Sequence, residues 1–156
     1  MPLKRKKRTQ TLAGLKKRAW KLLSEVIRRE AMDVPNGPYI RCYTCGYRNH
    51  WSGLQAGHAI GGRNGAVLLD EEIIRPQCVR CNIMLRGNYG EFVRRLIVEW
   101  AGGAPGYPNG LGHAMLWWEA KLQASRQVRK WDRAELEEKI EEYKARLEKL
   151  SPSPDR

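Results

Sequence analysis

The sequence predicts a small α+β fold, mostly helical, in which a short metal-bound core is flanked by N- and C-terminal helices. Four cysteines form two Cys-x2-Cys pairs, and apolar residues recur with helical periodicity on both sides of them. Residues 39–86 are rich in glycine, arginine and asparagine and hold too few apolar residues for a conventional core. A bound metal commonly stabilises such a segment. The 156 residues suffice for one domain with extensions.

The N-terminal part of the chain is strongly basic. Residues 1–8 predict a basic, disordered tail with five cationic side chains. Residues 9–34 predict an amphipathic helix, with one apolar stripe and an opposite face that carries Lys16, Lys17 and Lys21. Two prolines and a glycine directly after residue 34 end this element.

Residues 39–101 form the predicted core of the protein. We expect one strand up to Cys42, a second near residues 54–60, a glycine-rich turn, and then a short helix that begins at Val79. Residues 89–100 show the periodicity of a further helix, which closes this core.

The C-terminal part predicts a loop and helix over residues 102–130, and then a last helix over 131–150. Asp132 and Glu135 resemble a capping box. Apolar residues then recur at steps of four and three, as in a coiled-coil seam: Leu136, Ile140, Tyr143, Leu147 and Leu150. We expect this helix to make the protein a homodimer. The alternative is that it folds back onto its own domain.

The charge of the chain indicates the class of partner. A formal net charge of +12 favours a polyanion, and nucleic acid is the usual one. No stretch approaches the ~20 consecutive apolar residues of a membrane span. The basic start is not followed by an apolar signal-peptide core, so we expect a cytoplasmic protein.

The cysteines predict a structural zinc site. In a reducing compartment metal binding is a better explanation of paired cysteines than disulfides are. Two Cys-x2-Cys knuckles present four thiolates tetrahedrally, and four such ligands leave no open position for catalysis. Isolated buried thiols or a redox pair are the alternatives. The four ligands are Cys42, Cys45, Cys78 and Cys81.

A histidine and an asparagine stand in notable positions beside these knuckles. His58 lies between the two pairs, and Asn82 directly follows the last cysteine. This layout resembles the HNH family of ββα-metal nucleases. The run from Cys42 to Asn88, together with residues 131–150, resembles the NinG/Rap recombination proteins of lambda-type phages. The cysteine, histidine and asparagine layout is also similar to endonuclease VII of T-even phages, a Holliday-junction resolvase.

The resemblance implies an endonuclease that cuts branched recombination intermediates, such as Holliday junctions, with Mg²⁺ or Mn²⁺, in the host cytoplasm if the chain is phage-encoded. His58 would then act as the general base on water, and Asn82 would bind the catalytic metal through its carbonyl oxygen. The alternatives are a hydrogen-bonded structural histidine and a helix cap. We expect DNA contacts from the following basic residues: Lys4, Arg5, Lys6, Lys7, Arg8, Lys16, Lys17, Lys21 and Arg86.

The sequence departs from the HNH pattern at several positions, of which those near His58 matter most for chemistry. The usual acidic or histidine metal ligand directly before the base is replaced by Gly57, and Gln55 stands where similar proteins tend to carry Asp. One of Asp70, Glu71 and Glu72 could supply the missing ligand, or these residues form a solvated acidic turn. Two other functions stay open: a non-catalytic zinc-finger DNA-binding protein, and a phage assembly factor.

Overall fold

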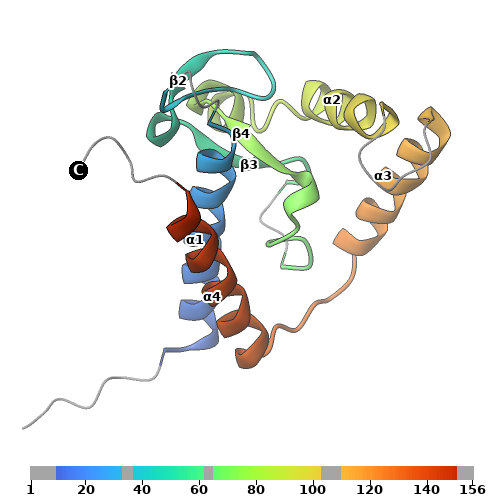
Figure 1. Cartoon of the computed structure of the whole chain (residues 1–156). Coiled ribbons are helices and arrows are strands. Elements are labelled where there is room, and N and C mark those ends of the chain that lie inside the picture. Colours follow the sequence, from blue (N-terminus) through green and yellow to red (C-terminus); the bar gives the residue numbers. More distant parts are fainter. Residues whose placement is uncertain (1–9, 33–36, 62–64, 103–109, 151–156) are drawn as a thin grey trace, which may run out of the picture.

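The computed structural model describes residues 10–32, 37–61, 65–102 and 110–150. The protein combines α and β structure and is mostly helical, as the sequence predicts (Figure 1). No helix in these ranges is long and apolar enough to cross a membrane. In chain order the elements are α1 (Leu12–Glu30), β1 (Tyr39–Arg41), β2 (Arg48–His50), η1 (Trp51–Gly53), β3 (Gln55–His58), η2 (Glu71–Ile73), β4 (Ile74–Gln77), η3 (Arg80–Met84), α2 (Tyr89–Ala101), α3 (Leu111–Ser125) and α4 (Arg133–Lys149).

The first and last helices pack against each other along most of their length (Figure 1). Thr11 caps α1 by accepting a hydrogen bond from the Gly14 amide at 3.1 Å, and Asp132 caps α4 in the same way. The apolar stripe of α1 and the apolar seam of α4 therefore bury one another within a single core. The buried residues are Leu15, Ala19, Leu23 and Val26 on α1, and Leu136, Ile140 and Tyr143 on α4.

This packing differs from the coiled coil that we expected residues 131–150 to form with a second copy. The seam lies against α1 of the same chain, which is the fold-back alternative. Arg146 fixes the arrangement, because its guanidinium bonds Glu30 of α1 at 2.8 Å and Glu71 of η2 at 2.7 Å. The seam thus no longer argues for a dimer, and the homodimer itself stays a prediction.

Two small antiparallel sheets lie near one end of α1. In the first, β1 pairs with β2 and Tyr39 opposes His50. In the second, β3 pairs with β4, and Gln55 opposes Gln77. Helix α1 packs on this second sheet, and β3 has a free edge, since β4 is its one neighbour within the described ranges.

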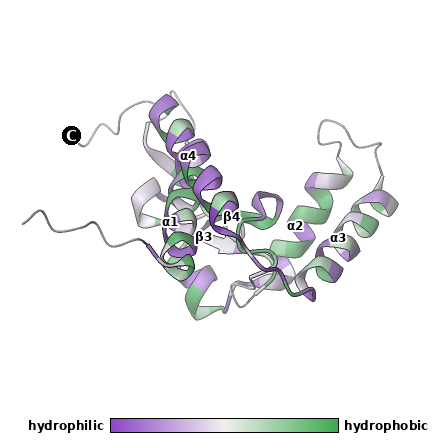
Figure 2. Ribbon diagram, turned by 90° about the horizontal axis from the view of Figure 1, so that it is seen from below, coloured by the Kyte–Doolittle hydropathy of each residue, from purple (hydrophilic) through white to green (hydrophobic). Residues whose placement is uncertain are grey.

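The short helix predicted from Val79 is a single π-helical turn, η3. It cannot continue as an α-helix because Arg86, Gly87 and Asn88 all take left-handed backbone conformations, with φ of 49°, 94° and 47°. The chain then enters α2, which pairs with α3 on the other side of the molecule from α1 and α4 (Figure 2). Trp100 and Trp117 stack between these two helices at 4.4 Å.

Candidate functional site

The four predicted cysteines come together at one point. Their sulfur atoms all lie within 4.8 Å of one another, and the sulfurs of Cys45 and Cys78 are 3.7 Å apart. A disulfide would need about 2.05 Å. Tetrahedral zinc with bonds of about 2.3 Å separates its sulfur ligands by roughly 3.8 Å. The cluster could therefore hold a zinc ion, as we predicted from the sequence.

Local backbone geometry builds each knuckle. Gly46 follows the first pair with a left-handed φ of 75°, and its amide donates to the carbonyl of Cys42 at 2.9 Å. After the second pair, the Asn82 amide donates to the carbonyl of Cys78, also at 2.9 Å. These turns bring the two sulfurs of each pair to one side. Leu54 and Ile40 pack with Cys42, Cys78 and Cys81, which are buried, whereas Cys45 is exposed.

The hydrogen bonds around Cys42 favour its thiolate form. Burial raises the pKa of the Cys42 thiol, but a hydrogen bond from Thr44 and bonds from backbone amides outweigh burial and lower the pKa to about 6. The hydroxyl of Thr44 lies 3.3 Å from the Cys42 sulfur. Since zinc binds the thiolate, the hydroxyl supports the ligand form of this residue.

His58, the predicted base, is buried at the end of β3 with an exposed fraction of 8%. Its ring stacks on Trp20 of α1, with 4.5 Å between ring centroids. Its Nε2 lies 3.1 Å from the carbonyl oxygen of Leu68. A carbonyl only accepts, so Nε2 must donate, and the lone pair of the neutral imidazole is then on Nδ1.

Asn82, the predicted metal ligand, lies on the other face of the hairpin. Alternation along β3 points Gln55 and Gly57 to one face and His58 to the opposite face. The side-chain amide of Asn82 donates to Oε1 of Gln55 at 2.7 Å. The hairpin thus separates His58 from Asn82, and no direct contact between them is found among the described residues.

A groove at the free edge of β3 is lined by Asn82 but not by His58. It has a volume of about 330 Å³ and lies between α1 and η3. Asn82 and Gln55 line it on one side, and Trp20, which covers the ring of His58, lines it on the other. We refer to this feature as the β3-edge groove. Asn82 is a site residue that we predicted from the sequence. Trp20 was not predicted, because its role depends on a contact with His58 of a distant strand.

Gly57, the position that departs from the HNH pattern, has a steric explanation. A Cβ at Gly57 would lie 2.0 Å from Oε1 of Gln77. Gln77 is fully buried, and its Nε2 donates to Thr44 and to the carbonyl of Gly87. The Gln77 side chain thus fills the space that a ligand at position 57 would need, and a carboxylate there would require Gln77 to move.

Comparison with known proteins places the chain in a family. The family model described as Bacteriophage Lambda NinG protein matches residues 3–152, which is nearly the whole chain. The chain belongs to the NinG family. Membership implies a function related to phage recombination. No curated protein and no solved structure gives a significant match.

In this NinG-family chain the acidic segment before β4 is structural. Asp70 and Glu72 both pair with Lys121 of α3, the former at 2.7 Å. Glu71 pairs with Arg146 of α4. These carboxylates therefore tie α3 and α4 to η2. None of the three lines the β3-edge groove as a metal ligand would, and none is left solvated without a partner.

The predicted DNA contacts fall into three groups. Lys4, Arg5, Lys6, Lys7 and Arg8 lie outside the described residues. Lys17 and Lys21 are exposed on α1 and Lys16 is half-buried, while Arg86 is exposed after η3. Arg28, which the sequence places on the basic face of α1 but which was not among the predicted DNA contacts, lines the β3-edge groove. The spacing of Lys17, Lys21, Ser24 and Arg28 places them along one face of the NinG helix α1, and that periodicity could have revealed it.

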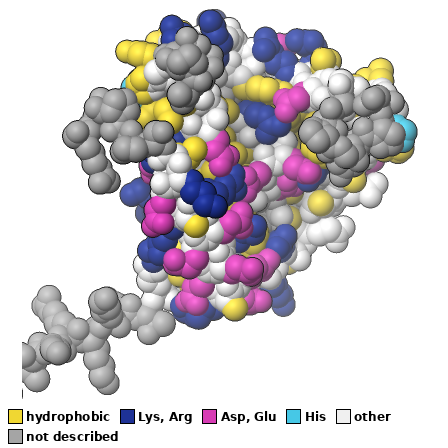
Figure 3. All heavy atoms as spheres, in the orientation of Figure 1, with side chains coloured by type: hydrophobic (Ala, Val, Ile, Leu, Met, Phe, Trp, Pro, Cys, Tyr) yellow, Lys and Arg dark blue, Asp and Glu magenta, His cyan; other side chains and the backbone are white. Residues whose placement is uncertain are grey.

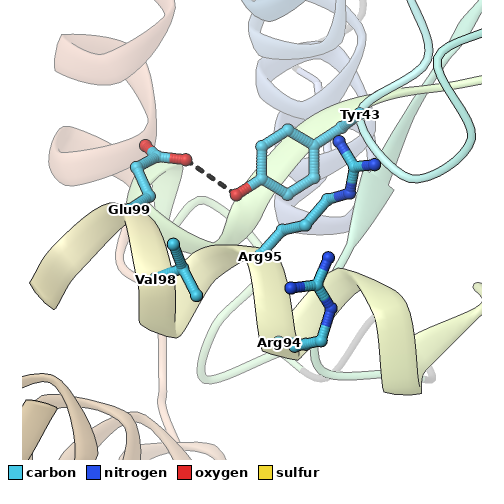
Figure 4. A pocket seen from close by; sticks show the side chains of 5 residues that line it. All are labelled: Tyr43, Arg94, Arg95, Val98 and Glu99. Atoms are coloured by element: carbon cyan, nitrogen blue, oxygen red, sulfur yellow. Dashed lines mark hydrogen bonds between the residues drawn. The ribbon is translucent and has the colours of Figure 1, made fainter. Parts of the chain in front are cut away.

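Two other charged surfaces of this NinG-family chain are internally neutralised. In a pocket beside α2, Tyr43 donates to Glu99 at 2.7 Å, while Arg94 and Arg95 line the same pocket (Figure 4). Hydrogen bonds from these two arginines lower the pKa of Glu91 to about 2. Over α4, acidic and basic side chains are intermingled (Figure 3). Neither surface offers the unpaired positive charge that phosphate binding requires.

Proposed function

We propose that this NinG-family protein is a metal-dependent DNA endonuclease that hydrolyses phosphodiesters in branched recombination intermediates, such as Holliday junctions, in the cytoplasm of a phage-infected host. The single observation that carries this proposal is the hydrogen bond between Nε2 of His58 and the carbonyl of Leu68. It leaves Nδ1 as the nitrogen that bears the lone pair in the neutral imidazole, so Nδ1 is the atom that would take a proton from water.

Trp20 and Leu68 then act on the ring of His58 together. Stacking on Trp20 restricts the tilt of the imidazole ring. The hydrogen bond to Leu68 restricts how the ring turns within its own plane. A base held in this way loses little orientational freedom when water is deprotonated. The basic face of α1 supports the proposal, because Lys17, Lys21 and Arg28 lead to the β3-edge groove and would draw a phosphate backbone towards it.

The oxygen donors in the groove suit a weakly bound divalent cation. Asn82 would hold Mg²⁺ or Mn²⁺ through its amide oxygen, while the hydrogen bond from its amide nitrogen to Gln55 orients it, and no carboxylate is among the lining residues. When bound, the ion supplies positive charge that stabilises the phosphate in the transition state. Because this donor is neutral, DNA phosphates would have to complete the ligand set, and we expect a high Mg²⁺ requirement.

The test compares a synthetic four-way junction with a duplex of matched sequence, each with Mg²⁺, Mn²⁺ or no added divalent ion. The zinc-loaded wild type should nick the junction only with a divalent ion. His58→Ala should lose about 10²–10⁴-fold in rate and keep junction binding, since the side chain acts on water.

His113→Ala is the matched control, because His113 lies at the start of α3, outside the groove lining. It should cut as the wild type does. If His58→Ala retained more than about a tenth of the wild-type rate, His58 would not be the base.

A second candidate function is non-catalytic, zinc-dependent DNA binding in recombination. The observation in its favour is the ligand set of the β3-edge groove: Gln77 excludes a ligand at Gly57, and no carboxylate is among the lining residues. If the protein binds the junction but does not nick it with either Mg²⁺ or Mn²⁺, this function is favoured over the nuclease.

A further inference from the structure

The end of η3 presents an apolar knob to solvent. Ile83, Met84 and Leu85 are consecutive and have exposed fractions of 60%, 73% and 47%. Val79, one turn earlier, is 47% exposed. Isolated exposed apolar side chains are common, but a contiguous group beside a groove marks a surface that binds another molecule.

The backbone of this knob is held rigidly. The Leu85 amide donates to the carbonyl of Arg80 at 2.8 Å, and the Gly87 amide donates to the carbonyl of Cys81 at 2.9 Å. Left-handed conformations at Arg86 and Asn88 cost free energy, which the surrounding bonds must offset. The apolar side chains are therefore displayed by a turn anchored to the cysteine cluster.

Unpaired positive charge flanks the knob. Arg80 precedes the three apolar residues and Arg86 follows them, and both side chains are exposed. Neither makes an ion pair within the described part of the chain, whereas Arg94, Arg95 and Arg146 all do. An apolar surface bordered by free guanidinium groups matches a ligand with apolar faces between phosphates, which is the chemistry of nucleic acid.

The knob also adjoins the β3-edge groove. Ile83 and Asn82 are neighbours in the chain, and both line the groove. A strand whose phosphate lies at Asn82 would therefore place its next bases against Ile83 and Met84.

We propose that Ile83, Met84 and Leu85 form a wedge that unstacks a base step at a DNA branch point, while Arg80 and Arg86 hold the flanking phosphates. This inference rests on the proposed function and names the residues that would recognise the branch. A continuous duplex keeps its bases stacked, so insertion there costs unstacking free energy. At a branch point fewer neighbouring base pairs hold the stack together, so the wedge unstacks a base step there at a smaller cost in free energy.

The experiment measures binding without cleavage. Full-length, zinc-loaded protein is titrated, with no added Mg²⁺ or Mn²⁺, into a four-way junction that carries 2-aminopurine at the branch, and into a matched duplex. Fluorescence of 2-aminopurine rises when it is unstacked. The wild type should prefer the junction and raise the signal. The double variant Ile83→Ser/Met84→Ser should bind the junction about ten- to a hundredfold more weakly and give no rise, with duplex affinity unchanged.

Two further variants separate the wedge from other effects. Leu116→Ser removes an apolar side chain of similar exposure, 71%, from α3, and should behave as the wild type. Arg80→Gln/Arg86→Gln should weaken junction and duplex alike and flatten the dependence of binding on salt.

The wedge would be overturned by wild-type junction binding and fluorescence in the double variant, or by a wild type without junction preference. The wedge would also be overturned if Ile83→Ser/Met84→Ser bound the junction normally but lost binding to a protein partner. Failure of the nuclease proposal is distinguishable, because an absence of nicking with Mg²⁺ would leave this assay unaffected.

Discussion

Gly57 and Gln77 compete for one volume on the face of the hairpin opposite His58, and this contact decides which side chains position 57 accepts. Oε1 of Gln77 is buried and has no hydrogen-bond partner among the described residues, although its amide nitrogen makes two bonds. A buried oxygen without a partner is costly. The chain tolerates this because Nε2 ties Thr44, next to the cysteine cluster, to Gly87 after η3.

We predict that Gly57→Ala destabilises the protein by about 1–3 kcal/mol, since its Cβ would lie 2.0 Å from Gln77 Oε1. In a Gln77→Ala background the same change should cost less than about 0.5 kcal/mol, because the clash is absent. Chemical denaturation of the four proteins measures this coupling. Equal costs of Gly57→Ala in both backgrounds would contradict the steric explanation.

Sequence reasoning located the cysteines, His58 and Asn82 because each stands in a motif with fixed spacing. It could not find Gln77 or Trp20, whose roles come from contacts between segments far apart in the chain. It also named Asp70 as a candidate metal ligand, with a solvated acidic turn as the alternative, because the local sequence is consistent with both. Its pairing with Lys121, 51 residues later, is invisible to local patterns.

At the scale of elements, the cysteine cluster joins β1, β2 and η3, which have few apolar contacts of their own. Strands β1 and β2 span three residues each, and η3 is a single turn. Their own apolar cluster is small and includes Cys42, Cys78 and Cys81 themselves. We therefore expect zinc binding to supply much of the free energy that orders these elements, together with the groove and the apolar knob beside them.

Cys78→Ser should lose zinc and unfold this region. Structural zinc contributes on the order of 10 kcal/mol, which is comparable to the whole stability of a typical domain. Elemental analysis and circular dichroism test this, with Val79→Ser as the control, because its exposed neighbouring side chain contacts no metal. A folded wild-type preparation without zinc would refute the metal assignment.

The element boundaries show what local signals can and cannot determine. Thr11 and Asp132 are capping residues next to apolar repeats, so both helix starts were within reach of sequence rules. The π-helical turn was not, because it depends on left-handed conformations at Arg86 and Asn88. Such conformations are uncommon outside glycine, and no propensity rule assigns them here.

For the whole molecule, the pairing of α1 with α4 is the main organising contact. It places the basic face of α1 beside the β3-edge groove and leaves a mixed-charge surface over α4 (Figure 3). The steps of four and three in α4 correctly indicated an apolar seam. They could not reveal which helix covers the seam, because a partner copy and α1 present the same kind of apolar stripe.

The last prediction follows from this fold-back. Ile140 is 2% exposed within the shared core, so Ile140→Ala should cost about 2–5 kcal/mol. Glu138→Ala, on the exposed face of α4, should change stability by less than about 0.5 kcal/mol. Because α4 packs within one chain, the denaturation midpoint should not vary over a hundredfold range of protein concentration. A midpoint that rises with concentration in the wild type, and loses this rise in Ile140→Ala, would instead assign the seam to a dimer, since association stabilises by mass action.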